Sequence, residues 1–341
     1  MKKSLLALAV LGAFAGAAAA QSSVTLYGRL DLSVNRGVGQ TAKNLSNGSG
    51  SRFGVRGNED LGGGMSALFN LEHRFDADTG GSQNFNITPT GTPVAAGSGT
   101  ANRFWGGRSI VGLKGNFGQV VLGREYTTAF LGSQLIADPW GWDTVVSATP
   151  GAGLNQALTG GNIARVRNDS SVTYNFAASG FRFGAQIAEA TDAINNFQKK
   201  PVNFSAGYSA GPVMVAMGYE KTGQVGAAAA KWTTLNGSFD LGMVKLGALF
   251  GTGNTSTNAK NKSVMLTAVA PMGQGELRAS VGKLTSDPAG VAPRVDAAKG
   301  FAVGYHYALS KRTTLYTDYV RNTGVGITQK TGYDFGIKHN F

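Results

Sequence analysis

The chain of 341 residues has no cysteine, nine prolines and three histidines. Without cysteine it can form no disulfide, thiolate metal site or thiol nucleophile, which is compatible with an oxidising envelope compartment. The histidines, His73, His306 and His339, are far apart in the sequence, and we interpret them as interface residues rather than metal ligands or bases. No G-x-x-x-x-G-K-[ST] phosphate loop is present either. We therefore expect no enzyme, no metal and no cofactor.

Long hydrophobic runs and acidic residues are also scarce. After residue 20, no stretch approaches the roughly 18 consecutive apolar residues that a membrane-spanning helix requires. The chain has 19 acidic and 31 basic side chains, which gives a formal net charge of +12. A basic chain can bind nucleic acid, but no helix-turn-helix, zinc-finger or RNA-binding motif accompanies the charge. Nucleic acid is therefore not an expected partner.

Residues 1–20 have the composition of a cleaved signal peptide. Lys2 and Lys3 precede an apolar stretch from Leu5 to Ala17, and three alanines then form a small-residue cleavage site before Gln21. The alternative is an uncleaved anchor helix, but the stretch is short, alanine-rich and not followed by stop-transfer charges. Nothing in the remaining 321 residues marks a linker, so we predict one domain over residues 21–341.

A strict two-residue alternation follows the leader. Over residues 24–35 the apolar side chains share one parity, and Thr25, Arg29, Asp31 and Ser33 lie on the other. Successive side chains of a strand point to opposite faces, so the pattern predicts a strand with one apolar and one hydrated wall. Twelve residues are enough for a tilted strand to cross a bilayer, which takes about 9–11. The pattern recurs to the C-terminus, and it indicates an all-β antiparallel transmembrane barrel with apolar residues outside and a polar, water-filled interior.

Glycine and the connections support the barrel. Glycine makes up 51 of 341 residues, about twice the usual share of roughly 7%, which suggests many tight turns and bends. Short turns at 115–118, 240–242 and 309–312 are interleaved with longer polar loops near 37–50, 77–103, 252–261 and 285–298. At roughly twenty residues per strand and connection, the chain holds about sixteen strands, enough for an aqueous channel.

One connection, residues 126–162, is too long and too apolar to be an ordinary loop. It carries Phe130, Trp140, Trp142 and several aliphatic side chains, and Asp138 and Asp143 are its only acids. Loops of this length without secondary structure are usually functional or disordered, and this composition argues against disorder. We expect the segment to fold into the barrel, to narrow the pore and to present Asp138 and Asp143. The alternative is a surface cap or a contact between subunits.

Several motifs, in this order, resemble the trimeric general diffusion porins of Gram-negative outer membranes, of the β-proteobacterial type. They are Ser23–Arg29, Ser51–Gly57 followed by Glu59–Gly64, Gly115–Gly118 leading into Leu122–Arg124, Ser310–Thr313 and the terminal Phe341. The resemblance covers essentially the whole chain after the leader.

The resemblance implies a sixteen-stranded barrel, a homotrimer in the outer membrane, and a constriction where the third extracellular loop bends inward. Matched by motif, the basic wall of that constriction falls on Arg29, Arg52, Arg124 and Arg165 or Arg167, with Arg56, Arg74 and Arg108 as neighbours and Glu72 as an inward acid. Arg124 shares parity with apolar residues, so pointing it inward needs a bulge, for which Gly123 is a candidate. Tyr333, Phe335 and Phe341 form the expected C-terminal signal for the barrel-assembly machinery. Membrane lipid and lipopolysaccharide are further expected partners.

A ring of arginines has a physical consequence of its own. Fixed guanidiniums in a narrow opening with low-dielectric walls raise the local concentration of anions and the barrier to cations. The sequence therefore predicts passive diffusion of small hydrophilic solutes and inorganic anions. One alternative is a substrate-selective channel in which Trp140, Trp142 and Phe130 form a binding surface. A secreted adhesin and an envelope enzyme are the alternatives outside the channel class.

Overall fold

A computed structural model describes residues 22–83, 104–147, 153–161, 163–189, 199–223, 228–290 and 293–341. The predicted signal peptide lies outside these ranges, as does most of the loop expected at 77–103. Within the described residues no helix is long and apolar enough to cross a membrane.

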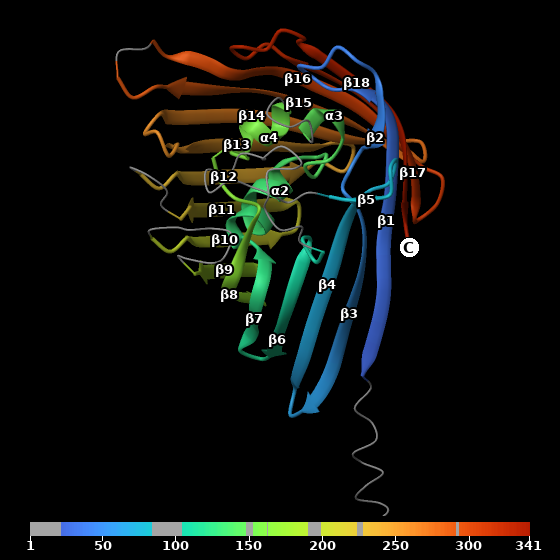
Figure 1. The fold of residues 1–341 in the computed structure, drawn as a ribbon, viewed down its shortest axis with the longest axis vertical. Helices are drawn as coiled ribbons and strands as arrows, with labels where there is room; N and C mark the ends of the chain where they lie inside the picture. Colours follow the sequence, from blue (N-terminus) through green and yellow to red (C-terminus); the bar gives the residue numbers. More distant parts are fainter. Residues whose placement is uncertain are drawn as a thin grey trace, which may run out of the picture.

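The described strands form one antiparallel sheet that closes on itself (Figure 1). Two strands are short, β2 (Asn44–Asn47) and β5 (Gly81–Ser82), and β2 pairs with β1. The barrel itself consists of sixteen longer strands: β1 (Ser23–Arg36), β3 (Ser51–Gly62), β4 (Met65–Asp76), β6 (Arg108–Gly115), β7 (Gly118–Tyr126), β8 (Arg167–Ala178), β9 (Phe181–Ala188), β10 (Val202–Ala210), β11 (Val213–Lys221), β12 (Lys231–Asp240), β13 (Lys245–Asn254), β14 (Lys260–Met272), β15 (Gly275–Asp287), β16 (Val295–Ala308), β17 (Thr313–Asn322) and β18 (Thr331–Asn340). Closure comes from β1, which pairs with both β3 and β18. The predicted fold class and strand number are confirmed.

The alternation predicted from the sequence is the alternation of the barrel wall. In β1, Val24, Leu26 and Val34 are exposed on the outer face, while Asp31 and Ser33 are buried on the inner face. The connections alternate as well, because turns of two to four residues link β3 to β4, β6 to β7 and each later pair, and longer segments link the others. An apolar exterior and a polar interior follow directly from the period of two.

The C-terminus closes the barrel seam. Phe341 N donates to Gly28 O at 3.1 Å, and Gly28 N donates to Phe341 O at 2.9 Å. Gly28 also makes room for the terminal ring, since a Cβ at this position would lie 2.2 Å from Phe341 Cζ. This contact explains why a glycine interrupts the apolar parity of the first strand.

The long segment between β7 and β8, residues 127–166, carries four short helical turns: η1 (Phe130–Gln134), α2 (Leu135–Ala137), α3 (Thr144–Ser147) and α4 (Leu154–Leu158). It is the third of the long connections. The first turn, η1, contacts β10, β11 and β12, while α4 contacts β14 to β17 and α3 contacts β17 and β18. Figure 1 shows α2, α3 and α4 within the curve of these strands.

One part of the inner wall differs from the sequence-based expectation of a uniformly polar interior. Trp232, Leu249, Met265, Leu284 and Val320 lie on the inner parity of β12 to β17 and are buried. They form one cluster with apolar side chains of the segment: Trp140, Val145, Val146, Leu154 and Leu158. The expectation was wrong here because the apolar residues of the segment need an apolar partner, and the wall beneath them supplies it.

Candidate functional site

Three arginines occupy one row across three neighbouring strands. Arg29 of β1 lies directly opposite Arg52 of β3, and Arg52 lies directly opposite Arg74 of β4. Each of the three is on the inner parity of its strand, as predicted. Like charges that face one another across a sheet destabilise it unless other groups compensate them. The surroundings of each guanidinium therefore determine what the row can do.

Two of the three guanidiniums are compensated by acids. Arg29 donates to Asp143 on the long segment, with Nη1 and Oδ2 3.2 Å apart, and to Asn340 Oδ1 at 2.8 Å. Arg74 donates to Glu72 Oε1 at 2.7 Å, and both side chains are buried. Two predicted acids, Asp143 and Glu72, thus lie within the arginine row.

Arg52, the central member, is different. Among the residues that the structure describes, its guanidinium makes no hydrogen bond or ion pair, and its side chain stays partly exposed on the inner face. Its close charged neighbours include Arg74, Arg29 and Glu72, and Glu72 is already paired with Arg74. The middle of the row therefore carries a positive charge that is not neutralised by a carboxylate of its own.

Tyr126 extends the row to the other side of β4. Its hydroxyl oxygen accepts from Arg74 Nη2 at 2.7 Å and from Arg167 Nη2 at 2.5 Å. The Arg167 guanidinium also lies over the Tyr126 ring, 4.0 Å from its centroid. Arg167 was predicted from the sequence and Tyr126 was not, because a tyrosine at a strand end carries no charge signal. Arg108 lies nearby and makes a bidentate ion pair with Glu125, at 2.8 and 2.9 Å from Nε.

The remaining predicted arginines have other surroundings. Arg124 is buried, donates to Gly106 O at 2.7 Å and pairs with Asp169 at 2.6 Å. The predicted bulge is present, since the β7–β8 register shifts between Gly123 and Glu125 and Gly123 has a φ of +120°. The extra residue lies on β8, however, so Arg124 keeps the parity of exposed Leu122.

Arg165 and Arg56 lie away from the row. Arg165 precedes β8 and is buried, and its backbone N donates to Glu220 Oε1 at 2.9 Å. Arg56 is exposed nearer the short turns, 5.2 Å from the centroid of the Tyr27 ring.

Asp138 does not face the arginine row, contrary to the sequence-based expectation. Its carboxylate is buried and accepts four hydrogen bonds from the segment itself, from Trp140 N, Trp142 N, Ser147 Oγ and Asn155 Nδ2, at 2.7 to 3.1 Å. Burial raises the pKa of this carboxyl, and the hydrogen bonds oppose the rise. Asp138 therefore organises the fold of the segment.

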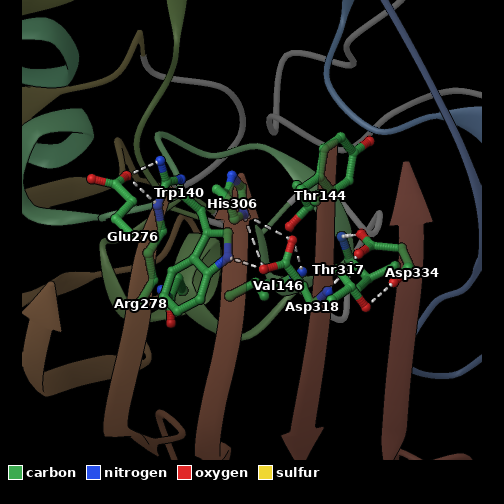
Figure 2. Close-up of polar contacts among 12 residues, drawn as sticks. Trp140, Thr144, Val146, Glu276, Arg278, His306, Thr317, Asp318 and Asp334 are labelled. Atoms are coloured by element: carbon green, nitrogen blue, oxygen red, sulfur yellow. Dashed lines mark hydrogen bonds and ion pairs between the residues drawn. The ribbon is translucent and has the colours of Figure 1, made fainter. Parts of the chain in front are cut away.

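A second set of contacts fastens the segment to β17 and β18, the strands next to β1. Figure 2 shows the Trp140 indole directed at Asp318 of β17, and Nε1 donates to Oδ1 at 2.6 Å. Val145 N donates to Asp334 Oδ2 of β18 at 3.0 Å, and Asp334 Oδ1 accepts from Asp318 N at 2.9 Å. His306 also contacts Asp318, at 3.1 Å. These contacts and the Asp143–Arg29 pair thus hold the segment against three neighbouring strands, β1, β18 and β17.

The described residues build neither a serine-nucleophile turn nor a metal site. Gly207–Gly211 reads G-Y-S-A-G, but it lies in the β10–β11 hairpin instead of the strand-to-helix turn that a nucleophilic serine requires. In the parts of the chain described here, no group of three or more His, Asp or Glu side chains could hold a metal ion. What the geometry offers is a set of fixed charges on an inner wall, facing a folded segment.

Comparisons with known proteins agree with this description. A family model described as Gram-negative porin matches residues 7–326. Outer membrane porin protein 32 of Delftia acidovorans is 32% identical, and an outer membrane porin protein of Bordetella pertussis is 29% identical, each over the full length of both chains. Among solved structures, the anion-selective porin from Comamonas acidovorans is 28% identical with a TM-score of 0.68, covering 94% of this chain and all of that one.

Proposed function

The chain belongs to the Gram-negative porin family of the outer membrane, and from this premise we propose that it is a passive channel whose constriction favours anions. Small hydrophilic solutes and inorganic anions diffuse through the barrel, and no catalytic group or cofactor takes part. Residues 21–341 form the mature barrel domain and residues 1–20 its cleaved signal peptide.

The observation that carries the anion preference is the arginine row with Arg52 at its centre. Arg29 and Arg74 each form an ion pair with a carboxylate, whereas Arg52 forms no ion pair within the described residues. Arginine stays charged at any working pH, so the field it sets up across the lumen is permanent. In a narrow opening between low-dielectric walls, that field concentrates anions. The related Comamonas protein is called anion-selective, which supports the same reading.

Residues 127–166 act in this proposal as the inward-folded third extracellular loop. Asp143 brings a negative charge to within 3.2 Å of Arg29, so the segment and the arginine row approach each other on one side of the lumen. Trp140 and Phe130 of the same segment are buried against the wall, and the Trp142 ring packs on Phe130 with centroids 4.8 Å apart. Aromatic rings that anchor a loop are not available as a binding surface for solutes, and this favours a general pore over a substrate-selective one.

We further propose that the barrel works as a homotrimer. An aromatic cluster on the outside of β3 and β4, formed by Phe53, His73, Phe75, Phe104 and Trp105, supports this, with ring centroids 4.2 to 6.4 Å apart. Aromatic residues of this kind are enriched at protein interfaces. Phe341, held at the barrel seam, is the part of the C-terminal signal that we expect the assembly machinery to read, with Tyr333 and Phe335 on the same outer face.

Reconstitution of the purified protein in a planar bilayer tests the proposal. We expect discrete conductance steps, and under a KCl gradient a reversal potential of the sign that anion permeation produces. The absence of steps would overturn the channel, whereas steps with a cation-selective reversal potential would overturn only the arginine field.

The ion pair between Asp143 and Arg29 gives a finer prediction. In Asp143→Asn, Arg29 loses its carboxylate and the row gains one unit of positive charge, so we expect the ratio of anion to cation permeability to rise by roughly threefold. Asp240→Asn, at the β12–β13 turn, removes the same charge outside the lumen and serves as the control. A reversal potential equal in the two variants would show that Asp143 does not border the ion path.

A further inference from the structure

A cavity of about 670 Å³ lies between the folded segment and the inner wall of β6 to β9, near the short turn that joins β6 to β7. In Figure 1 this turn is at the bottom, at the same end of the barrel as the turn between β3 and β4. Lys114 at the cavity and Arg108 beside the arginine row are six residues apart on β6, which corresponds to about 20 Å along the strand. The cavity is therefore separate from the arginine row.

The segment forms the roof of this cavity through Thr128, Leu131 and Gly132. Glycines let the roof approach the wall closely. A Cβ at Gly184 of β9 would lie 2.8 Å from Thr128 Cβ, and a Cβ at Gly132 would lie 2.3 Å from Ser205 Oγ on β10. Close packing at both points fixes the roof, so the cavity is preformed. Its volume is in the range of ligand-binding pockets, about 300–1,000 Å³.

The wall of the cavity carries two cations and two amides. Lys114, Gln119 and Asn175 lie directly opposite one another on β6, β7 and β8, and Arg182 of β9 lies one inner position nearer the short turns. Among the described residues no Asp or Glu lines the cavity, and the side chains of Lys114, Gln119 and Asn175 make no hydrogen bond or ion pair. Arg182 donates only to a neutral hydroxyl, Ser209 Oγ, at 3.3 Å. This wall offers charged and neutral donors to an anion.

The roof adds an apolar surface. Leu131 is 39% exposed, whereas its neighbours Phe130 and Ser133 in η1 are buried. Leu131 lines the cavity together with Ala177 on the wall. Chloride or phosphate would fill only a small part of the volume and would leave this apolar surface in water. A solute that uses the whole cavity must therefore carry both a negative charge and an apolar part.

We infer that this cavity binds small organic anions with an apolar part, such as an aromatic carboxylate. The carboxylate lies between Lys114 and Arg182, within reach of the two amides, and the ring contacts Leu131. The inference rests on the proposed channel, because the solute reaches the cavity through the lumen. It deepens that proposal by naming a class of solute that the pore retains between the arginine row and the end with the short turns.

The test compares two double variants that lose the same charge. Lys114→Gln with Arg182→Gln alters the cavity, while Lys311→Gln with Arg312→Gln alters the exposed turn between β16 and β17 at the same end of the barrel. Binding of benzoate to the purified protein in nanodiscs is measured by ligand-observed NMR titration. We expect the cavity variant to bind benzoate about tenfold more weakly than wild type, and the turn variant to bind like wild type. Equal affinity of the two variants overturns the inference.

Further probes show which parts of the solute are recognised. Wild type should bind benzoate about tenfold more tightly than benzamide, which has no charge, and more tightly than acetate, which has no ring. Leu131→Ala leaves both cations in place and should weaken benzoate binding by about threefold, with acetate binding unchanged. Leu241→Ala, at the exposed turn between β12 and β13, is its control. Benzamide or acetate binding as tightly as benzoate contradicts the inference.

Conductance separates this inference from the proposed function. Benzoate binding is measured without ion flow, and conductance steps in KCl are recorded from the same preparations. Steps in wild type combined with equal benzoate binding by wild type and the cavity variant would overturn the inference and leave the channel standing. Absence of steps would overturn the channel, whatever the protein binds.

Discussion

Replacing Arg52 by glutamate should reverse the ion preference of the channel. The substitution changes the charge at the centre of the arginine row by two units and leaves Arg29 and Arg74 paired with Asp143 and Glu72. The centre of the row then carries a negative charge where wild type has a positive charge without a carboxylate of its own. The expected readout is a change of sign in the reversal potential under a KCl gradient.

The magnitude follows from Coulomb's law. A unit charge about 5 Å from the ion path contributes about 0.8 kcal/mol even with the dielectric constant of water. Two units, reduced by salt screening, shift the permeability ratio by roughly tenfold. Arg52→Gln, which removes one unit, should give about half of the shift in the logarithm of that ratio.

Arg312→Glu is the matched control, because it makes the same charge change at an exposed turn remote from the row. It should leave the reversal potential close to that of wild type. If Arg52→Glu inserts, conducts and retains the anion-selective sign, the narrow point of the pore is not lined by this row. Arg52→Gln introduces no negative charge beside Glu72. It therefore still tests the prediction if the glutamate variant does not fold.

Replacing Asp138 by alanine should open the pore. Four donors of the segment, two backbone N–H groups and the side chains of Ser147 and Asn155, lose their common acceptor inside a buried turn. Each buried donor left unsatisfied costs about 1–3 kcal/mol, so the folded segment loses several kcal/mol relative to a loosened one. We expect single-channel conductance to rise by roughly twofold, with added current noise, because the segment no longer holds one position in the lumen.

Asp240→Ala provides the comparison for this prediction. Asp240 also accepts a backbone hydrogen bond, from Gly242 N at 2.8 Å, but it does so in an exposed turn. The Asp240→Ala channel should have the same single-channel conductance as wild type. Unchanged conductance and noise in Asp138→Ala would mean that contacts to the wall, such as Trp140 to Asp318, suffice to hold the segment in place.

Features that depend on neighbours in the chain could be predicted from the sequence. The barrel follows from the alternation in β1 and its recurrence, because the period of two sets each strand's outer and inner face without reference to other strands. The same parity predicts that the side chains of Arg29, Arg52 and Arg74 point inward. A register shift beside Gly123 was also predictable, because a charged residue interrupting an apolar parity signals a local irregularity, but the extra residue lies on β8 and Arg124 keeps the outer parity.

Features that depend on which strands face each other could not be predicted. Parity shows that Arg52 points inward, but only the register of β1, β3 and β4 places it between Arg29 and Arg74. The role of Asp138 was mispredicted because an acid in an apolar loop looks the same in sequence whether it faces the pore or caps a turn. Tyr126 carries no charge, and it becomes part of the site only because two guanidiniums converge on its hydroxyl.

The sequence by itself therefore determined the class of structure: a lipid-facing barrel of about sixteen strands with a charged interior and one unusual connection. Only the tertiary structure decided which charges meet and which remain uncompensated. The physical reason is that the alternation is a local consequence of backbone geometry. Pairing of charges depends instead on strand register and on the packing of residues 127–166 against strands distant in the chain, as far as the 178 residues between Trp140 and Asp318.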